Sequence, residues 1–236
     1  MIGTLMDAFA RQRLASPMRL VLAFVVLLLG VAPALVTGSL EVLGSNTMDP
    51  FAFVFAFGLI GQDVSSGVLT LAFARPVRRG DYVLARWLGA SVLATMGVLL
   101  EVLAATGAVV LRHGEPSVTL MASKFLLGTF AAFGLSAVIL MLSSLVPGLG
   151  DLGVYLLARI GGGLLSMAGV YWQAGWLSRA GEEALRFLDA SLDPIPWLGH
   201  GPVSWFAVTS YLSTLTISIV VAMWAVNRKE LSYASG

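Results

Sequence analysis

Residues 83–111 read VLARWLGASVLATMGVLLEVLAATGAVVL and contain only two charged side chains, Arg86 and Glu101. A helix that crosses the hydrocarbon core of a bilayer needs about 20 predominantly apolar residues. This stretch exceeds that length, and it therefore predicts a transmembrane helix.

The composition of the whole chain agrees with this assignment. Of 236 residues, 58% are hydrophobic and 11% are charged, whereas a soluble domain carries roughly 25% charged residues. These values and a mean hydropathy of +0.89 exclude a water-soluble enzyme. A net charge of +1 without a long basic block excludes a nucleic-acid binder and a disordered chain. The absence of cysteine excludes a disulfide scaffold, a thiol nucleophile and a thiolate metal site.

Further apolar runs accompany this stretch along the chain. They cover residues 20–37, 51–62, 118–145, 152–172 and 205–226. We therefore predict an all-α, polytopic membrane protein in which residues 1–236 form a single transmembrane domain with six transmembrane helices.

The run 51–62 is too short to cross a bilayer by itself. Asp49-Pro50 is typical of a helix start, with proline at the first helical position. A helix that starts there must continue past Asp63 to cross the membrane. Alternatively the helix starts near Gly44 and kinks at Pro50, and we favour this alternative.

The distribution of basic residues predicts the orientation. Six spans place both termini on one side, and the loops of that side hold most of the arginines. The positive-inside rule therefore places both termini in the cytoplasm and the chain in the inner (cytoplasmic) membrane. Residues 20–36 also weakly permit a cleaved signal peptide, but five further spans follow and Pro33 is awkward in the cleavage motif.

Two stretches have the opposed apolar and charged faces typical of interfacial helices. Residues 1–17 are expected to form a helix on the cytoplasmic surface. Residues 173–204 are expected to form an outer-face segment, whose part 176–193 is amphipathic and sits on or dips into the outer leaflet. Asp193-Pro194-Ile195-Pro196 is expected to break that helix. The segment is either an ordinary loop helix or a gate on the exit side.

Three ionisable residues fall inside predicted spans, namely Glu101, Lys124 and Arg159. Charged side chains are costly at this depth, which makes each a candidate functional residue. Glu101 and Lys124 lie in hairpin-joined helices at depths that their side chains can bridge, so we predict an ion pair, either structural or on a transport path. Arg159 is expected to reach the cytoplasmic headgroups.

Ala158, Gly162 and Ser166 recur at four-residue spacing in the fifth span. Small residues in register allow helix backbones to approach closely. The pattern indicates either packing within one subunit or a dimer seam, and we take the dimer seam as our prediction.

Sequence motifs for catalysis are absent from the chain. The P-loop pattern Gly-x4-Gly-Lys-Ser/Thr is missing, because neither Lys124 nor Lys229 follows a glycine. The two histidines, His113 and His200, lie in predicted outer loops, so no histidine base is expected inside the membrane. We therefore expect no enzymatic activity, metal or cofactor in this chain.

Residues 61–89 read GQDVSSGVLTLAFARPVRRGDYVLARWLG. This stretch has an acid at a helix end, a short apolar helix, a proline stop and a basic turn, followed by a helix cap at Asp81. Residues 64–79 are thus expected to present a small amphipathic element to the cytoplasm.

In this arrangement the stretch resembles the membrane-spanning permease subunits of exporter-type ABC transporters, the type-2 permease family. That family has an acid, a glycine four residues later, a leucine-rich stretch and a proline-containing turn before the next span. The matching residues here are Asp63, Gly67, Leu69 to Phe73, Arg75-Pro76-Val77-Arg78 and Tyr82 onward. Asp63 stands where the family usually has glutamate, and Val68 stands where it usually has threonine.

The resemblance implies a dimer of permeases, or a pair of related permeases, bound to two ATPase subunits that hold ATP and Mg²⁺. It also implies that the helix 64–76, within the cytoplasmic coupling segment 64–79, is the coupling contact with the ATPase. The implied contact residues are Asp63, Gly67, Val68, Leu71, Ala72, Arg75, Pro76, Arg78 and Arg79.

The expected function is therefore that of a permease subunit, which moves a substrate across or out of the membrane using ATP hydrolysis in a partner. Lipid, drug, peptide, haem and ions are all compatible substrates. The alternatives are a membrane scaffold or assembly factor without transport, and an intramembrane enzyme acting on lipid or peptide.

Overall fold

The structure is a computed structural model and describes residues 2–43, 50–65, 78–146, 148, 150–198, 202 and 204–229. These residues form helices, turns and coil, without a strand in the described ranges. The α-helices are α1 (Ile2–Leu14), α2 (Pro17–Thr37), α3 (Pro50–Ala56), α4 (Gly61–Ser65), α6 (Arg79–Leu111), α7 (Val118–Leu145), α8 (Gly150–Tyr171), α9 (Gly175–Leu188) and α10 (Trp205–Lys229). Two 3-10 helices, η1 (Leu40–Val42) and η2 (Ile195–Leu198), lie in the connections.

Five of these helices, α2, α6, α7, α8 and α10, are long and apolar enough to cross a membrane. Large apolar side chains on their outer faces are exposed, as Leu157 and Leu164 of α8 are at 71% and 62%. Such surfaces are stable against lipid and not against water. The all-α fold and the multi-pass membrane character predicted from the sequence are thereby confirmed.

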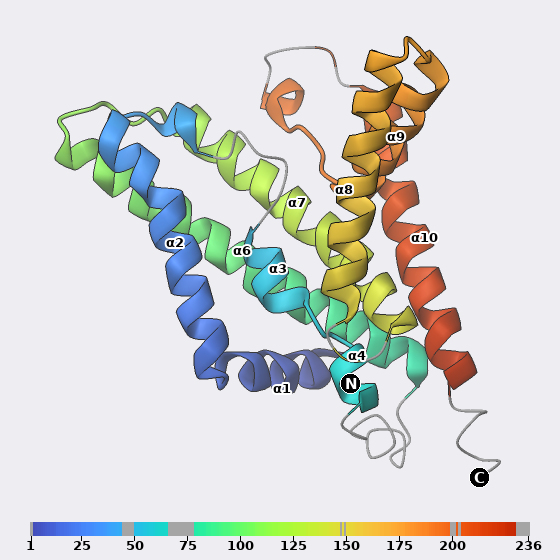
Figure 1. The fold of residues 1–236 in the computed structure, drawn as a ribbon. Coiled ribbons are helices and arrows are strands. Elements are labelled where there is room, and N and C mark those ends of the chain that lie inside the picture. The colour runs from blue at the N-terminus through green and yellow to red at the C-terminus, as the bar shows by residue number, and fades with distance from the viewer. Residues whose placement is uncertain are drawn as a thin grey trace.

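The long helices run alternately between two ends of the molecule (Figure 1). One end holds α1, α4, the start of α6 and the last turn of α10, and we call it the α1 end. The opposite side holds the connection between α6 and α7 and, apart from it in this view, the connection between α8 and α9; we call this side the α9 end. Helices α6 and α7 form the central hairpin, against which α3 and α10 pack.

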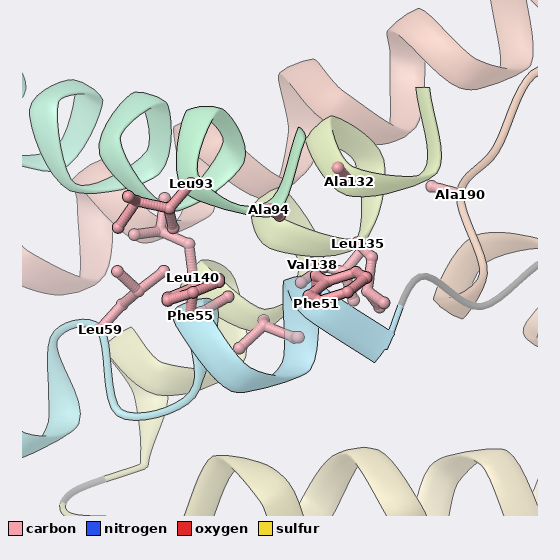
Figure 2. Close-up of a cluster of buried hydrophobic side chains, with 14 of the residues drawn as sticks. Phe51, Phe55, Leu59, Leu93, Ala94, Ala132, Leu135, Val138, Leu140 and Ala190 are labelled. Atoms are coloured by element: carbon pink, nitrogen blue, oxygen red, sulfur yellow. The ribbon is translucent and has the colours of Figure 1, made fainter. Parts of the chain in front are cut away.

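The core lies where α3 meets this central hairpin. Figure 2 shows Phe51 and Phe55 of α3 directed toward side chains of α6 and α7, such as Leu93 and Val138. The Phe51 ring occupies the space that the missing side chain of Gly97 leaves on α6. Inside a membrane, packing of this kind stabilises helix association through van der Waals contact.

The predicted second span is a short helix interrupted by a turn. Helix α3 begins at Pro50 and ends at Ala56, residues 57–60 form a turn in which Gly58 has φ of +65°, and α4 follows. Gly44, the favoured start of that span, lies outside the described residues. In the described part the break falls at 57–60, and the predicted kink at Pro50 stays a prediction, because residues 44–49 lie outside the described residues.

Partners from distant parts of the chain stabilise this turn. The Gly58 amide donates to Asp151 Oδ2 at 2.8 Å, and the amides of Ile60 and Gly61 donate to Ser143 Oγ at 3.1 and 2.9 Å. Non-helical backbone at membrane depth is tolerated only where other protein groups satisfy its hydrogen bonds. Asp151 and Ser143 therefore make the interruption possible.

Helix α9 returns along α8 from the α9 end, as Figure 1 shows. Its charged residues are exposed while Gly181 and Leu188 are buried, which agrees with the amphipathic pattern of the sequence. The helix ends at Leu188, before the predicted stop at Asp193-Pro194. The chain then reaches Gly134, near the middle of α7, where the missing side chain of Gly134 leaves room for the Ala190 backbone.

Candidate functional site

The segment 64–79 lies mainly outside the described residues. The predicted contact residues Gly67, Val68, Leu71, Ala72, Arg75 and Pro76 fall in the range 66–77, of which the structure describes nothing. Arg78 and Arg79 are described and exposed. Helix α6 begins at Arg79, so Asp81 lies in its first turn and is not the predicted helix cap.

Asp63 is buried, with 4% of its surface exposed, and does not face outward toward a partner. Its Oδ2 accepts hydrogen bonds from Tyr82 Oη and from an Arg86 guanidinium nitrogen. The Asp63 and Arg86 side chains are 6% and 9% exposed, which makes this a buried ion pair. Asp63 precedes the segment 64–79 and its two partners follow it, so the three residues fasten the two ends of the segment to each other. We call Asp63, Tyr82 and Arg86 the clamp.

The clamp follows from helix geometry in α6 and from an aromatic residue in α1. Tyr82 and Arg86 are four residues apart and therefore share one face of α6. The Arg86 guanidinium lies 4.6 Å from the centroid of the Phe9 ring, within the range of a cation–π interaction. Phe9 is buried against Gly89, where a larger residue would collide with its ring. Helices α1, α4 and α6 are therefore joined at the α1 end.

Arg13 extends from α1 into the broken second element. Its Nη1 and Nη2 atoms donate hydrogen bonds to the carbonyl oxygens of Phe57 and Gly58 at 2.8 and 3.0 Å, respectively. These are carbonyls just past the C-terminus of α3, where a cation is favourable. Burial, with repulsion from Arg19 and Arg86, lowers the pKa of Arg13 to about 9.

A cavity of about 580 Å³ adjoins this arginine at the α1 end. It lies between α1, α2, α3 and α4. Its lining residues are Gln12, Arg13, Ser16, Met18, Arg19, Leu22, Phe53, Val54, Phe57, Gln62, Asp63 and Leu152. Arg19 donates to Gln62 Oε1 at 2.9 Å within this lining.

Arg159 does not reach toward the α1 end as the sequence suggested. It forms an ion pair with Asp189, and Tyr155 Oη donates to the same Asp189 oxygen at 2.9 Å. The reason is the return of α9, which brings Asp189 beside the middle of α8 and offers a nearer partner than the headgroups. The Arg159 and Asp189 side chains are 30% and 11% exposed, respectively.

The predicted ion pair between Glu101 and Lys124 is not formed, although both residues are described. Lys124 Nζ donates to the Glu41 carbonyl oxygen at 3.3 Å, near η1. The Glu101 carboxyl lies against Gly30 of α2, in space that the missing side chain of Gly30 leaves free. The two side chains thus point to different neighbours, which corrects the expectation from depth alone.

The face of α8 that carries Gly162 and Ser166 is covered by α9. A methyl group at Gly162 would lie 3.2 Å from Leu185 of α9, and Gly181 packs directly on the Ser166 backbone. Ala158 remains exposed. The small residues therefore serve packing within the chain at Gly162 and Ser166, where we had predicted a dimer seam.

The sequence alone did not predict the contacts of Arg13, Ser143 and Asp151. The available signal was the glycine pair Gly58 and Gly61 in an apolar run, which indicates a break with unsatisfied backbone groups. The sequence does not say which side chains satisfy them. Among the described residues, no group of three or more His, Asp or Glu side chains is arranged to hold a metal ion.

Comparison with protein-family models and with curated proteins finds no match to this chain. The family resemblance of residues 61–89 therefore depends on those residues alone. The described part adds the buried ion pair of Asp63 with Arg86, the partly buried ion pair of Arg159 with Asp189, a broken helix and a cavity bordered by two arginines.

Proposed function

We propose that this chain is the membrane-spanning permease subunit of an ABC transporter, working with a second permease copy and with separate ATPase subunits that hold ATP and Mg²⁺. Residues 64–79 are the coupling segment that contacts the ATPase. The observation that carries the proposal is the clamp. A segment that transmits force needs firm attachment at both ends, and the clamp supplies that attachment at Asp63 and Arg86.

The clamp also connects the segment to the rest of the bundle. Arg86 contacts Phe9 and Gln12 of α1, and Arg13 of the same helix holds the end of α3. Displacement of residues 64–79 by a partner would therefore shift α4, α6, α1 and α3 together. Interfaces of this kind switch between discrete arrangements, so small displacements become helix movements.

The charge distribution supports an orientation with the α1 end in the cytoplasm. This end carries the described arginines Arg11, Arg13, Arg19, Arg78, Arg79, Arg86 and Arg228, whereas Arg112 follows the far end of α6 and Arg179 and Arg186 lie in α9. Cytoplasmic loops carry the excess of basic residues in membrane proteins. The proposal thus places both termini, and residues 64–79, on the side where ATP is available.

The test compares two apolar-to-acidic substitutions at opposite ends of the molecule. Leu71→Glu changes the proposed contact, and the control Val118→Glu changes an exposed residue at the α9 end. Each variant is purified in mild detergent and assayed for a bound P-loop ATPase by mass spectrometry and for ATP hydrolysis in proteoliposomes.

We expect Leu71→Glu to insert into the membrane and to show the unfolding transition of the wild type. It should nevertheless lose the ATPase, because burial of a carboxylate in the proposed apolar contact with the ATPase carries a large desolvation cost. Val118→Glu should retain the ATPase. An ATPase bound to Leu71→Glu at the wild-type level would reject residues 64–79 as the contact. If the purified wild-type protein carried no ATPase, the alternative function of a membrane scaffold without transport would be favoured.

A further inference from the structure

The cavity at the α1 end has an excess of positive charge. Arg13, Arg19 and Arg86 face one another closely enough for mutual repulsion. The nearby carboxylate is Asp63, and Arg86 and Tyr82 already bind it. In the described part of the chain, no carboxylate lies within ion-pair distance of Arg13 or Arg19. Two guanidinium groups therefore border this cavity without a counterion.

Guanidinium groups bind phosphate oxygens through short, charge-assisted hydrogen bonds. Arg13 is 3% exposed and is fixed in place by its bonds to Phe57 and Gly58. Each guanidinium carries five N–H donors, so Arg13 and Arg19 keep donors beyond those used in their bonds to the protein. Both arginines line the same cavity, so one anionic group inside it could bind both.

The other half of the cavity lining is apolar and continues onto the membrane-facing surface of α2. Met18 and Leu22 line the cavity, and Val25 and Leu29 follow them on the same face of the helix. These four side chains are between 43% and 73% exposed. A hydrocarbon chain attached to the anionic group would lie along this stripe, whereas a free anion would leave it uncovered.

We propose that the cavity between α1, α2 and α3 binds an anionic phospholipid, with its phosphate between Arg13 and Arg19 and an acyl chain along Met18, Leu22, Val25 and Leu29. The volume of about 580 Å³ lies within the range of sites for small molecules. Basic pockets between membrane helices near the cytoplasmic surface bind lipid headgroups in this way. All residues of the proposed site come from this chain, so lipid binding can be tested without an ATPase partner.

The test measures lipid binding to the purified full chain in detergent by native mass spectrometry. Phosphatidylglycerol and phosphatidylcholine are offered at equal concentration, and inorganic phosphate is added in a separate arm. Arg19→Gln removes one of the two cations and leaves Arg13 in place. Arg179→Gln, on the exposed face of α9, is the matched control for loss of one positive charge.

Ser16→Asp is a second variant that adds a carboxylate to the lining. Ser16 is the N-cap residue of α2 and makes no side-chain capping bond, and aspartate is an equally good N-cap residue. This substitution should therefore leave folding intact while it lowers the positive charge of the cavity by one. Thermal unfolding without added lipid checks that each variant is folded.

We expect the wild type and Arg179→Gln to prefer phosphatidylglycerol over phosphatidylcholine. Arg19→Gln should bind phosphatidylglycerol about tenfold more weakly, the effect of losing one charged hydrogen bond. Ser16→Asp should also bind it more weakly, because the added carboxylate repels the phosphate. Unchanged binding in folded Arg19→Gln and Ser16→Asp, or a wild type without the preference, would overturn the proposal. Displacement of the lipid by inorganic phosphate would also overturn it, in favour of a site for free anions.

Discussion

The packing of α9 on α8 can be tested with one added methyl group. In Gly181→Ala, the new methyl would lie 2.6 Å from the Gly162 carbonyl oxygen and 2.9 Å from Ser166 Cα, whereas ordinary contacts begin at 3.4 Å. Both atoms belong to the α8 backbone and cannot rotate away. Ser166 N of α8 would lie closer still, so helix α9 must move away from α8 by more than the 0.8 Å shortfall at the carbonyl oxygen.

The control is Gly163→Ala in α8, where a methyl group would meet no atom within 4 Å. Alanine is favoured over glycine in a helix by about 1 kcal/mol at either position. This gain cancels when the two variants are compared. Overpacking of a well-packed site costs about 1–3 kcal/mol, so Gly181→Ala should be less stable than Gly163→Ala by that amount.

The assay is reversible unfolding in mixed micelles, which gives the free energy of unfolding for each variant. Equal values for Gly181→Ala and Gly163→Ala would mean that α9 does not pack on α8 as described. The small-residue face at Gly162 would then be available to a second copy. In that case Gly162→Leu should lower the dimer fraction in a way that depends on protein concentration.

Three further outcomes are expected. Asp63→Asn and Arg86→Gln should each lower the free energy of unfolding by about 3–5 kcal/mol, since each leaves a buried group unpaired, and the double variant should lose less than their sum. Unfolding of the four proteins in this cycle measures the coupling, and additivity would reject the clamp. Glu101→Lys with Lys124→Glu should recover no stability over the single changes, because the two side chains have different neighbours; recovery of expressed protein would restore the predicted pair. Retention of phosphatidylglycerol should be constant from about pH 6 to about pH 8, because both guanidinium groups stay protonated over this range; a fall within this range would point to another group.

The long helices could be predicted from the sequence alone, but the side-chain contacts between them could not. Long apolar runs such as 83–111 predict spans because lipid requires every backbone group to bond within its own helix. That requirement is local, so one stretch of sequence decides it. Ion pairs such as Arg159 with Asp189 depend on how distant elements approach, and a depth estimate from each span alone assigned Arg159 to the headgroups.

Small residues were informative in the same limited sense. The spacing of Gly162 and Ser166 correctly indicated that another helix backbone approaches α8 closely. It did not indicate which helix, because α9 and a second copy of the chain would satisfy the same pattern. The clamp was missed for a related reason: Asp63 matched a motif of partner contact, while Tyr82 and Arg86 carried no signal of their own.

The interrupted second element has a consequence for biosynthesis. The backbone amides of its turn donate hydrogen bonds to Ser143 and Asp151, which lie 83 and 93 residues beyond their respective partners Ile60 and Gly58. A ribosome completes residues 50–65 long before it makes those side chains, and α3 alone is too short to cross a bilayer. The element therefore settles into the membrane only after α7 and the start of α8 have emerged. Until then, we expect the polar backbone of this part of the nascent chain to remain at the membrane surface, where water satisfies its hydrogen bonds.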